Sequence, residues 1–373
     1  MAADLYRKLQ QNLDRMPVPF PATDSGIELR ILERLFTPEE AEVALALSMI
    51  PEGAGVILPR LDEGWSVETL LPVLEGMAGK GVIEAIRMRG ERRFGKSPLA
   101  VGIYERQLPY LTAELQREMD AYFDEAFGAA FHSGGTPQMR TVPVQVDLTP
   151  ERPIARYDDI RSFVRESKGP FAVMECICRK GKDLTGEPCL QTKARRTCLT
   201  FGPAARGMVE SGAAELIERE RTLEILDLAD AEGLVLQPQN TEKPWFVCCC
   251  CGCCCGVLRS AKLLPEPAAY FSANYLAEVD ADLCSACAIC EERCQMEAVQ
   301  MVAGHSVVDA ARCIGCGLCI STCATGAMRL SAKEKPTPPP ANVQNLYLKM
   351  YRERFGAYET AKALGKAVLR KQV

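Results

Sequence analysis

Histidine is nearly absent from this chain, which has only His132 and His305 among its 373 residues. So little imidazole excludes a zinc site of three histidines, and it argues against a Rieske centre and a histidine-based catalytic triad. Glycine-rich phosphate loops in their usual setting are missing as well. The letters G-x-x-x-x-G-K-S occur once, from Gly90 to Ser97, but in a stretch that predicts the second strand of a ribbon and not a loop between a strand and a helix. Gly76 to Gly81 does not fit G-x-G-x-x-G. We therefore do not expect nucleotide or flavin binding by those folds.

Long apolar runs are also missing, because no stretch of 18 apolar residues occurs that would predict a membrane span. The start, MAADLYRKLQQNLDRM, is charged and amphipathic, unlike a secretory signal. A net charge of −5 shows no basic excess, which argues against a protein built mainly to hold nucleic acid. Nineteen cysteines in tight clusters, an odd number, do not indicate a secreted disulfide framework. We expect a cytoplasmic protein of a reducing, anaerobic cell.

The first 100 residues predict two capped helices followed by a β-ribbon. Thr37-Pro38-Glu39-Glu40 is a capping-box helix start, and Ser66 precedes a second apolar helix that ends at Gly81. Val82 to Phe94 then reads as two strands around Arg89-Gly90. This order, over residues 26–100, resembles a winged-helix domain. The second helix carries Glu68, Pro72 and Glu75, whereas the basic residues gather in the ribbon: Arg87, Arg89, Arg92, Arg93 and Lys96. We expect a docking or dimerisation module and not a DNA reader.

Further elements are predicted in the second half of the chain. Ala213 to Glu232 is expected to form a charged helix that Gly233 stops, and Leu234 to Leu236 a strand. Lys335 to Pro340 is a proline-rich linker. Residues 341–373 predict a helix with seven Lys or Arg against two Glu. This helix could pack on the body or on an acidic partner, or it could stay solvated.

Eight cysteines form two copies of one motif. C-x2-C-x2-C-x3-C occurs twice, and the second copy lies 29 residues after the first. Three cysteines on a tight loop can reach three irons of one cubane, but the fourth lies too far round and points at the neighbouring cluster. We therefore predict two 4Fe–4S clusters with crossed ligands. The first set is Cys284, Cys287, Cys290 and Cys323, and the second is Cys313, Cys316, Cys319 and Cys294.

These motifs resemble those of the bacterial dicluster ferredoxins, over residues 274–332. The resemblance implies low-potential electron transfer through two 4Fe–4S clusters; zinc is the alternative ligand. One departure concerns the residue after each fourth cysteine. The family usually has proline there, whereas this chain has Gln295 and Ala324, so loop rigidity and cluster potentials do not carry over.

Eleven other cysteines lie upstream, and packing alone does not explain their density. They are Cys176, Cys178, Cys189, Cys198, Cys248, Cys249, Cys250, Cys251, Cys253, Cys254 and Cys255. We expect some of them, not all, to bind one or two further iron–sulfur clusters, or one cluster together with a redox-active or zinc site. Adjacent cysteines on an extended chain point to opposite faces, so about half of the 248–255 run can face one cluster. Nearby cations would favour the thiolates: Arg179, Lys180, Lys182, Lys193, Arg195 and Arg196.

The fold class predicted from these patterns is α+β and multidomain. The parts are a winged-helix-like helical domain (1–149), a cysteine-rich α/β metal-binding region (150–273), the dicluster ferredoxin domain (274–332), and a linker with a basic C-terminal helix (333–373). This layout resembles the multi-cluster iron–sulfur proteins of strict anaerobes. We expect an electron-transfer subunit, not an enzyme in its own right, that serves a partner oxidoreductase; a homo-oligomer stays open. The alternatives are a redox-sensing transcription regulator and a reductase whose middle cluster is catalytic.

Overall fold

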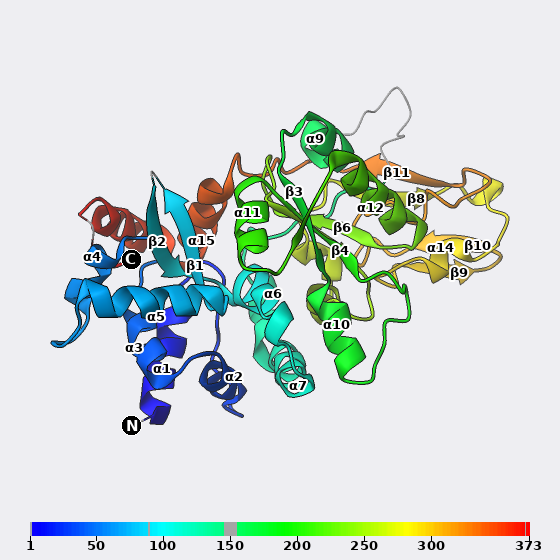
Figure 1. The fold of residues 1–373 in the computed structure, drawn as a ribbon. Coiled ribbons are helices and arrows are strands. Elements are labelled where there is room, and N and C mark those ends of the chain that lie inside the picture. The colour runs from blue at the N-terminus through cyan, green and yellow to red at the C-terminus, as the bar shows by residue number, and fades with distance from the viewer. Residues whose placement is uncertain (1, 89, 145–154, 370) are drawn as a thin grey trace. The chain divides into compact units, whose positions relative to one another are not determined.

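The structure, a computed structural model, describes residues 2–88, 90–144, 155–369 and 371–373. The described chain is mixed α/β and ends in a helix, as expected (Figure 1). It divides into two compact units. Unit 1 comprises Met1–Gly134, Glu210–Ala213 and Tyr347–Val373, and unit 2 comprises Gly135–Val209 and Ala214–Leu346. The predicted boundary at residues 149 and 150 lies outside the described residues, and those at 273 and 332 stay predictions.

Unit 1 is built from helices and one β-hairpin. Its helices are α1 (Ala2–Leu13), α2 (Ile27–Leu35), α3 (Pro38–Ala46), α4 (Ala54–Ile57), α5 (Val67–Gly79), α6 (Tyr104–Arg106), α7 (Ala113–Tyr122) and α8 (Gly128–His132). Short 3-10 or π turns are η1 (Leu58–Arg60), η2 (Leu99–Ile103), η3 (Leu108–Tyr110) and η4 (Phe123–Phe127). The hairpin pairs β1 (Ile83–Met88) with β2 (Glu91–Lys96). Arg89, in the predicted turn, lies outside the described residues.

Local capping signals explain where two of these helices begin. The Thr37 hydroxyl accepts from the Glu40 N–H at 3.2 Å, and the Glu40 carboxylate accepts from the Thr37 N–H at 2.8 Å. Ser66 caps α5 in the same way, with Thr69 as its partner. Both predicted helix starts are therefore confirmed. The order of helix, helix and hairpin agrees with the winged-helix expectation, while the family relationship stays a prediction.

The C-terminal helix α15 (Val343–Val368), which is interrupted at Gly356, packs within unit 1 from residue 347 onward. The Arg354 guanidinium donates to the Met16 carbonyl and to the Asp14 carboxylate, each at 2.6 Å. The Met49 N–H donates to the Val373 carbonyl at 3.1 Å. Of the three alternatives for this segment, the structure therefore favours packing on the body.

A five-stranded antiparallel sheet forms the centre of unit 2, in the order β5-β3-β4-β7-β6. Its strands are β3 (Phe171–Glu175), β4 (Arg196–Phe201), β5 (Glu215–Ile217), β6 (Val235–Pro238) and β7 (Phe246–Cys250). The helices around it are α9 (Ile160–Glu166), α10 (Ile177–Leu184), α11 (Gly202–Glu210), α12 (Arg219–Ala231) and α13 (Gly256–Lys262), with turns η5 (Arg156–Asp158) and η6 (Pro267–Tyr270). The buried face of α12 packs against β3, β4 and β6.

One predicted helix begins later than expected. The segment expected to be helical from Ala213 starts its helix only at Arg219, because residues 215–217 extend and pair with β3 as the edge strand β5. The predicted end is confirmed: Gly233 follows α12 with φ +69, a left-handed conformation that glycine adopts without a steric cost.

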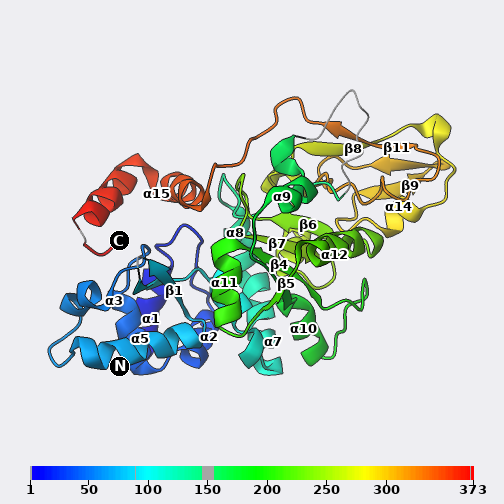
Figure 2. The same cartoon turned by 45° about the horizontal axis from the view of Figure 1, so that its top comes forward.

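The last part of unit 2 contains two small antiparallel sheets. Figure 2 shows β8 (Tyr275–Val279) beside β11 (Met328–Ala332), and β9 (Val299–Val302) pairs with β10 (His305–Val308). Between the strands lie the two cysteine loops, with η7 (Ala281–Leu283) and α14 (Ile289–Glu292) in the first.

Candidate metal centres

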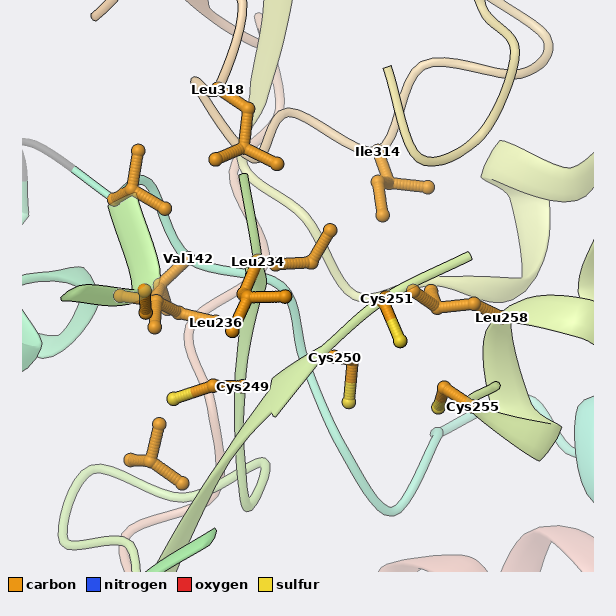
Figure 3. Close-up of a cluster of buried hydrophobic side chains, with 14 of the residues drawn as sticks. Val142, Leu234, Leu236, Cys249, Cys250, Cys251, Cys255, Leu258, Ile314 and Leu318 are labelled. Carbon is orange, nitrogen blue, oxygen red and sulfur yellow. The ribbon is translucent and has the colours of Figure 1, made fainter. Parts of the chain in front are cut away.

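Strand β7 carries the start of the cysteine run into the sheet, between β4 and β6. Because side chains alternate along a strand, Cys248 and Cys250 lie on one face and Cys249 on the other. Figure 3 shows the sulfur of Cys249 pointing away from those of Cys250, Cys251 and Cys255. The strand therefore separates one thiol from the rest of the run, as the alternation predicts.

A closed chain of neighbouring thiols, in which each shifts the pKa of the next, joins six of the eleven upstream cysteines. It runs in the order Cys176, Cys178, Cys255, Cys250, Cys248, Cys198 and back to Cys176. We call these residues the six-thiol ring. The ring has two thiols more than the four that a cubane cluster takes.

Two ring thiols lie at helix starts and are poised to be thiolates. Cys176 is the N-cap residue of α10, and Cys255 is that of α13. Hydrogen bonds with Cys178 lower the pKa of both. On β7, hydrogen bonding with Cys198 lowers the pKa of Cys248 to about 6. The pKa values of Cys176, Cys248 and Cys255 are thus lowered toward the charge state that iron prefers, whereas hydrogen bonds with their neighbours raise those of Cys178, Cys198 and Cys250.

A second group consists of Cys189, Cys251, Cys253 and Cys254, which we call the four-thiol group. All four Sγ atoms lie within 4.8 Å of one another, so the group could hold a metal. Cys189 Sγ is 3.6 Å from that of Cys251 and 3.7 Å from that of Cys253, and the Cys253 and Cys254 sulfurs are 3.6 Å apart. Cys189 lies between α10 and β4, whereas the other three form the turn between β7 and α13.

Cys249 belongs to neither group. Its side chain is buried, and burial raises its pKa to about 12. By contrast, a hydrogen bond with Cys251 lowers the pKa of Cys189 to about 6. The eleven thiols thus divide into a ring of six, a group of four and one buried thiol beside the hydrophobic core.

One buried cation lies between the two groups. The guanidinium of Arg179 is fully buried, and it donates to the Cys249 carbonyl at 3.2 Å and to Cys251 Sγ at 3.9 Å. No carboxylate of the described residues pairs with it, and its Nε has no hydrogen-bond partner there. Burial lowers the pKa of Arg179, but the charges of Cys176 and Cys251 outweigh burial and raise it overall. The counter-charge of this cation must therefore come from thiolates.

The other predicted cations have carboxylate partners or face solvent. Lys180, Lys182, Arg195 and Arg196 form ion pairs with Glu175, Glu187, Asp183 and Glu215 respectively. Lys193 is exposed. Of the six basic residues that the sequence suggested, Arg179 is the one placed against the thiols.

The two cysteine motifs of residues 284–323 are related by matching hydrogen bonds. The Ala277 N–H donates to Cys313 Sγ, and the Ser306 N–H donates to Cys284 Sγ, both at 3.5 Å. Donors and acceptors are each 29 residues apart, which is the spacing of the sequence repeat. The duplication is therefore present in the hydrogen bonding as well as in the motif.

The structure places the fourth cysteine of the first motif beside the second motif. Burial raises the pKa of Cys316 to about 12, and the charges of Cys294 and Cys313 contribute to this rise. Burial also raises the pKa of Cys319, and the charges of Cys316, Cys313, Cys294 and Cys290 add to that effect. These charges support the predicted set of Cys294, Cys313, Cys316 and Cys319, which stays a prediction.

The other predicted set is less compact. The Ser306 hydroxyl contacts Cys290 Sγ at 3.0 Å and Cys284 Sγ at 3.8 Å, which joins these two thiols. Cys287 is exposed. Cys323 Sγ accepts from the Met328 N–H at 3.3 Å, and no hydrogen bond links it to the other three within the described ranges. The crossed assignment of Cys323 stays a prediction.

The two cysteine loops differ in exposure. Residues 285–287 of the first loop are exposed, whereas Cys313, Ile314, Gly315 and Cys319 of the second are buried. A Cβ on Gly315, which has φ +63, would lie 2.2 Å from the Tyr275 carbonyl oxygen. The second loop is therefore packed against backbone that only glycine can approach so closely.

Gln295, which takes the place of the usual proline, connects the second cluster set to the four-thiol group. Its Oε1 accepts from the Gly252 N–H at 2.7 Å, and its Nε2 donates to Gln191 Oε1 at 2.9 Å. Gly252 separates Cys251 from Cys253, and Gln191 lies two residues after Cys189. The departure from the ferredoxin pattern thus has a structural role in this chain.

Comparison with known proteins identifies a recognised domain in the last part of unit 2. The family described as a 4Fe-4S binding domain matches residues 305–328, which contain Cys313, Cys316, Cys319 and Cys323. The chain therefore carries a 4Fe–4S binding domain there, together with an upstream cysteine group that could hold a metal. No curated protein and no solved structure matches the chain. Among the described residues, no helix has the length and apolar character needed to cross a membrane.

Sequence reasoning did not single out Ser306, and it gave Arg179 no special place among the cations. Ser306 lies 29 residues after Ala277, so the two residues occupy equivalent positions in the sequence repeat. The repeat could therefore have indicated that Ser306, like Ala277, lies beside a cysteine. The burial of Arg179 had no signal in the sequence, because it depends on β4 and β7 closing over the start of α10.

Proposed function

We propose that this chain is an iron–sulfur electron-transfer protein or subunit that binds two 4Fe–4S clusters in residues 284–323. The observation that carries the proposal is the recognised 4Fe–4S binding domain at residues 305–328, and the charge of Cys294 acting on the buried Cys316 supports the crossed ligand set. The second set is Cys294, Cys313, Cys316 and Cys319, and by the repeat the first is Cys284, Cys287, Cys290 and Cys323.

The residues around these sulfurs suit a cluster. When bound, 4Fe–4S clusters supply one-electron transfer. Backbone N–H groups of Ala277, Ser306 and Met328 donate to cysteine sulfurs, which stabilises negative charge there and raises the potential. The Ser306 hydroxyl adds a contact to two thiols of the first set. These donors are fixed by short strands and need no rearrangement when the charge changes.

The exposed first loop is the place where a redox partner protein would dock. Cys287 is exposed, and two exposed apolar side chains, Leu283 and Ile289, flank it. Apolar groups beside an exposed cluster ligand would suit a small, transient interface. The buried second loop lies on the side of Gln295 and the cysteine-rich middle.

A further iron–sulfur centre in the six-thiol ring is part of the proposal. The ring gathers more thiols than a cubane takes, which favours either a cluster with two spare thiols or a larger one. The spare thiols also support a second candidate function, a reductase whose middle centre reduces thiols or disulfides. Iron ligated by thiolates alone would argue against that candidate, because catalysis needs an open coordination position.

A DNA-binding regulator receives less support. On the ribbon, Arg92 pairs with Glu75 of α5 at 2.8 Å and Arg93 pairs with Glu91 at 3.1 Å. These cations already have carboxylate partners, so they are poorly placed to meet phosphates.

Iron and sulfide analysis of the anaerobically purified full chain tests the proposal. We expect at least eight irons with equal acid-labile sulfide, and reversible low-potential reduction that added DNA does not change. Fewer than eight irons in fully reconstituted protein would contradict two clusters. A promoter-sized DNA shift with a steep salt dependence would favour the regulator instead.

A further inference from the structure

The four-thiol group is too compact for a cubane cluster. In a cubane, each thiolate binds a different iron, so two iron corners stand between any pair of ligand sulfurs. In a mononuclear site, all four sulfurs surround one ion. For tetrahedral zinc with Zn–S bonds of about 2.3 Å, neighbouring sulfurs are about 3.8 Å apart. In this group, the Cys189–Cys251, Cys189–Cys253 and Cys253–Cys254 sulfurs are 3.6, 3.7 and 3.6 Å apart, and all four lie within 4.8 Å of one another.

The surroundings also fit one ion with four thiolates. Such a site has a net charge of about −2 for a divalent ion. Arg179 is a fully buried cation with no carboxylate partner among the described residues, and it contacts Cys251 Sγ at 3.9 Å. A buried guanidinium without a counter-charge would be strongly destabilising, so it indicates anionic sulfur beside it, from Cys176 of the six-thiol ring and from Cys251 of this group.

The four donors come from two segments of the chain, which Gln295 also links through Gly252 and Gln191. Cys189 lies in a stretch without helix or strand, and Cys251, Cys253 and Cys254 form a turn. A Cβ on Gly252 would lie 2.4 Å from the Gln295 carbonyl oxygen, so this turn is pressed against the backbone that follows Cys294. One ion would fix the turn and the Cys189 segment together, close to the second cluster set.

We propose that Cys189, Cys251, Cys253 and Cys254 bind a single metal ion in a closed tetrahedral thiolate site, occupied by zinc or by mononuclear iron. This goes beyond the proposed function, which concerns clusters held by other cysteines. All four positions are filled by the chain, so the site is structural if it holds zinc and a one-electron centre if it holds iron. Binding the ion releases the protons of those cysteines that are still thiols.

The test compares metal and sulfide contents of the full chain and two variants, all purified anaerobically. Cys253→Ser removes one proposed ligand. Cys249→Ser is the matched control, since it lies in the same run but outside both thiol groups. We expect Cys253→Ser to lose one metal atom per chain and no acid-labile sulfide, while Cys249→Ser loses neither.

The lost element identifies the ion: zinc or iron without sulfide both support a mononuclear site. Loss of several irons together with equal sulfide would overturn the proposal in favour of a cluster, and so would unchanged metal content. If Cys253→Ser does not fold, native protein produced in cobalt-supplemented medium gives a second readout. The visible bands of one tetrahedral cobalt thiolate per chain support the site, and their absence overturns it. The iron count of the native chain tests the two clusters separately, so the two failures are distinguishable.

Discussion

Replacing Arg179 by methionine should weaken metal binding at the four-thiol group without removing a ligand. Methionine keeps the length of the aliphatic stem but loses the charge and the hydrogen bonds to the Cys249 carbonyl. At the 3.9 Å between Arg179 Nη1 and Cys251 Sγ, two unit charges attract by about 4 kcal/mol at an effective dielectric constant of about 20. Since about 1.4 kcal/mol corresponds to a tenfold change, we expect binding to weaken by roughly 100- to 1000-fold.

The assay is competition between the full chain and a chelator of known affinity, carried out anaerobically and followed by metal analysis. Lys193→Met is the control, because Lys193 belongs to the same basic segment but is exposed, so solvent and salt screen its charge. Its metal affinity should stay within a few fold of native. If Arg179→Met folds and retains native affinity, the buried cation does not compensate a metal–thiolate charge, and the electrostatic reasoning is refuted.

Three further outcomes are expected. Cys294→Ser should abolish the EPR signal of the cluster bound by the second motif; loss of the first motif's signal instead would refute crossed ligation. Gly252→Ala places a Cβ 2.4 Å from the Gln295 carbonyl oxygen and should lower the free energy of unfolding by roughly 1–3 kcal/mol. Gly207→Ala, a helical glycine with open space, should not destabilise; equal urea midpoints for both would contradict the close approach. Burial lowers the pKa of Lys96 from 10.5 to about 8, so the unfolded chain binds this proton more tightly and stability should rise between those pH values, by about 3 kcal/mol. That rise should vanish in Lys96→Met, and its persistence would show that another group causes it.

Features encoded over a few residues were predictable from the sequence. The capping boxes at Thr37 and Ser66 and the glycine after α12 each depend on contacts between near neighbours, so their patterns located the helix ends correctly. The start of α12 was missed for the opposite reason. Residues 215–217 have a helical pattern, but pairing with β3 holds them extended. No nearby residue in the sequence indicates that β3 is their partner.

The grouping of the upstream cysteines could be predicted only in part. Strand alternation indicated that the 248–255 run must divide, and Cys249 does point away from Cys250 and Cys251. Which distant thiols join each half depends on β4 pairing with β7 and on the position of the segment around Cys189. Those are long-range contacts, and the spacing of the cysteines along the sequence carries no information about them.

Gln295 connects the segment that follows Cys294 to the four-thiol group. A proline after the fourth cysteine would have no N–H and no side-chain amide, so it could neither accept from Gly252 nor donate to Gln191. With glutamine there, the side chain next to Cys294 is hydrogen-bonded to both segments of the four-thiol group. If both sites hold metal as proposed, these two hydrogen bonds fix the second cluster set and the four-thiol group in one register, through the residue that departs from the ferredoxin pattern.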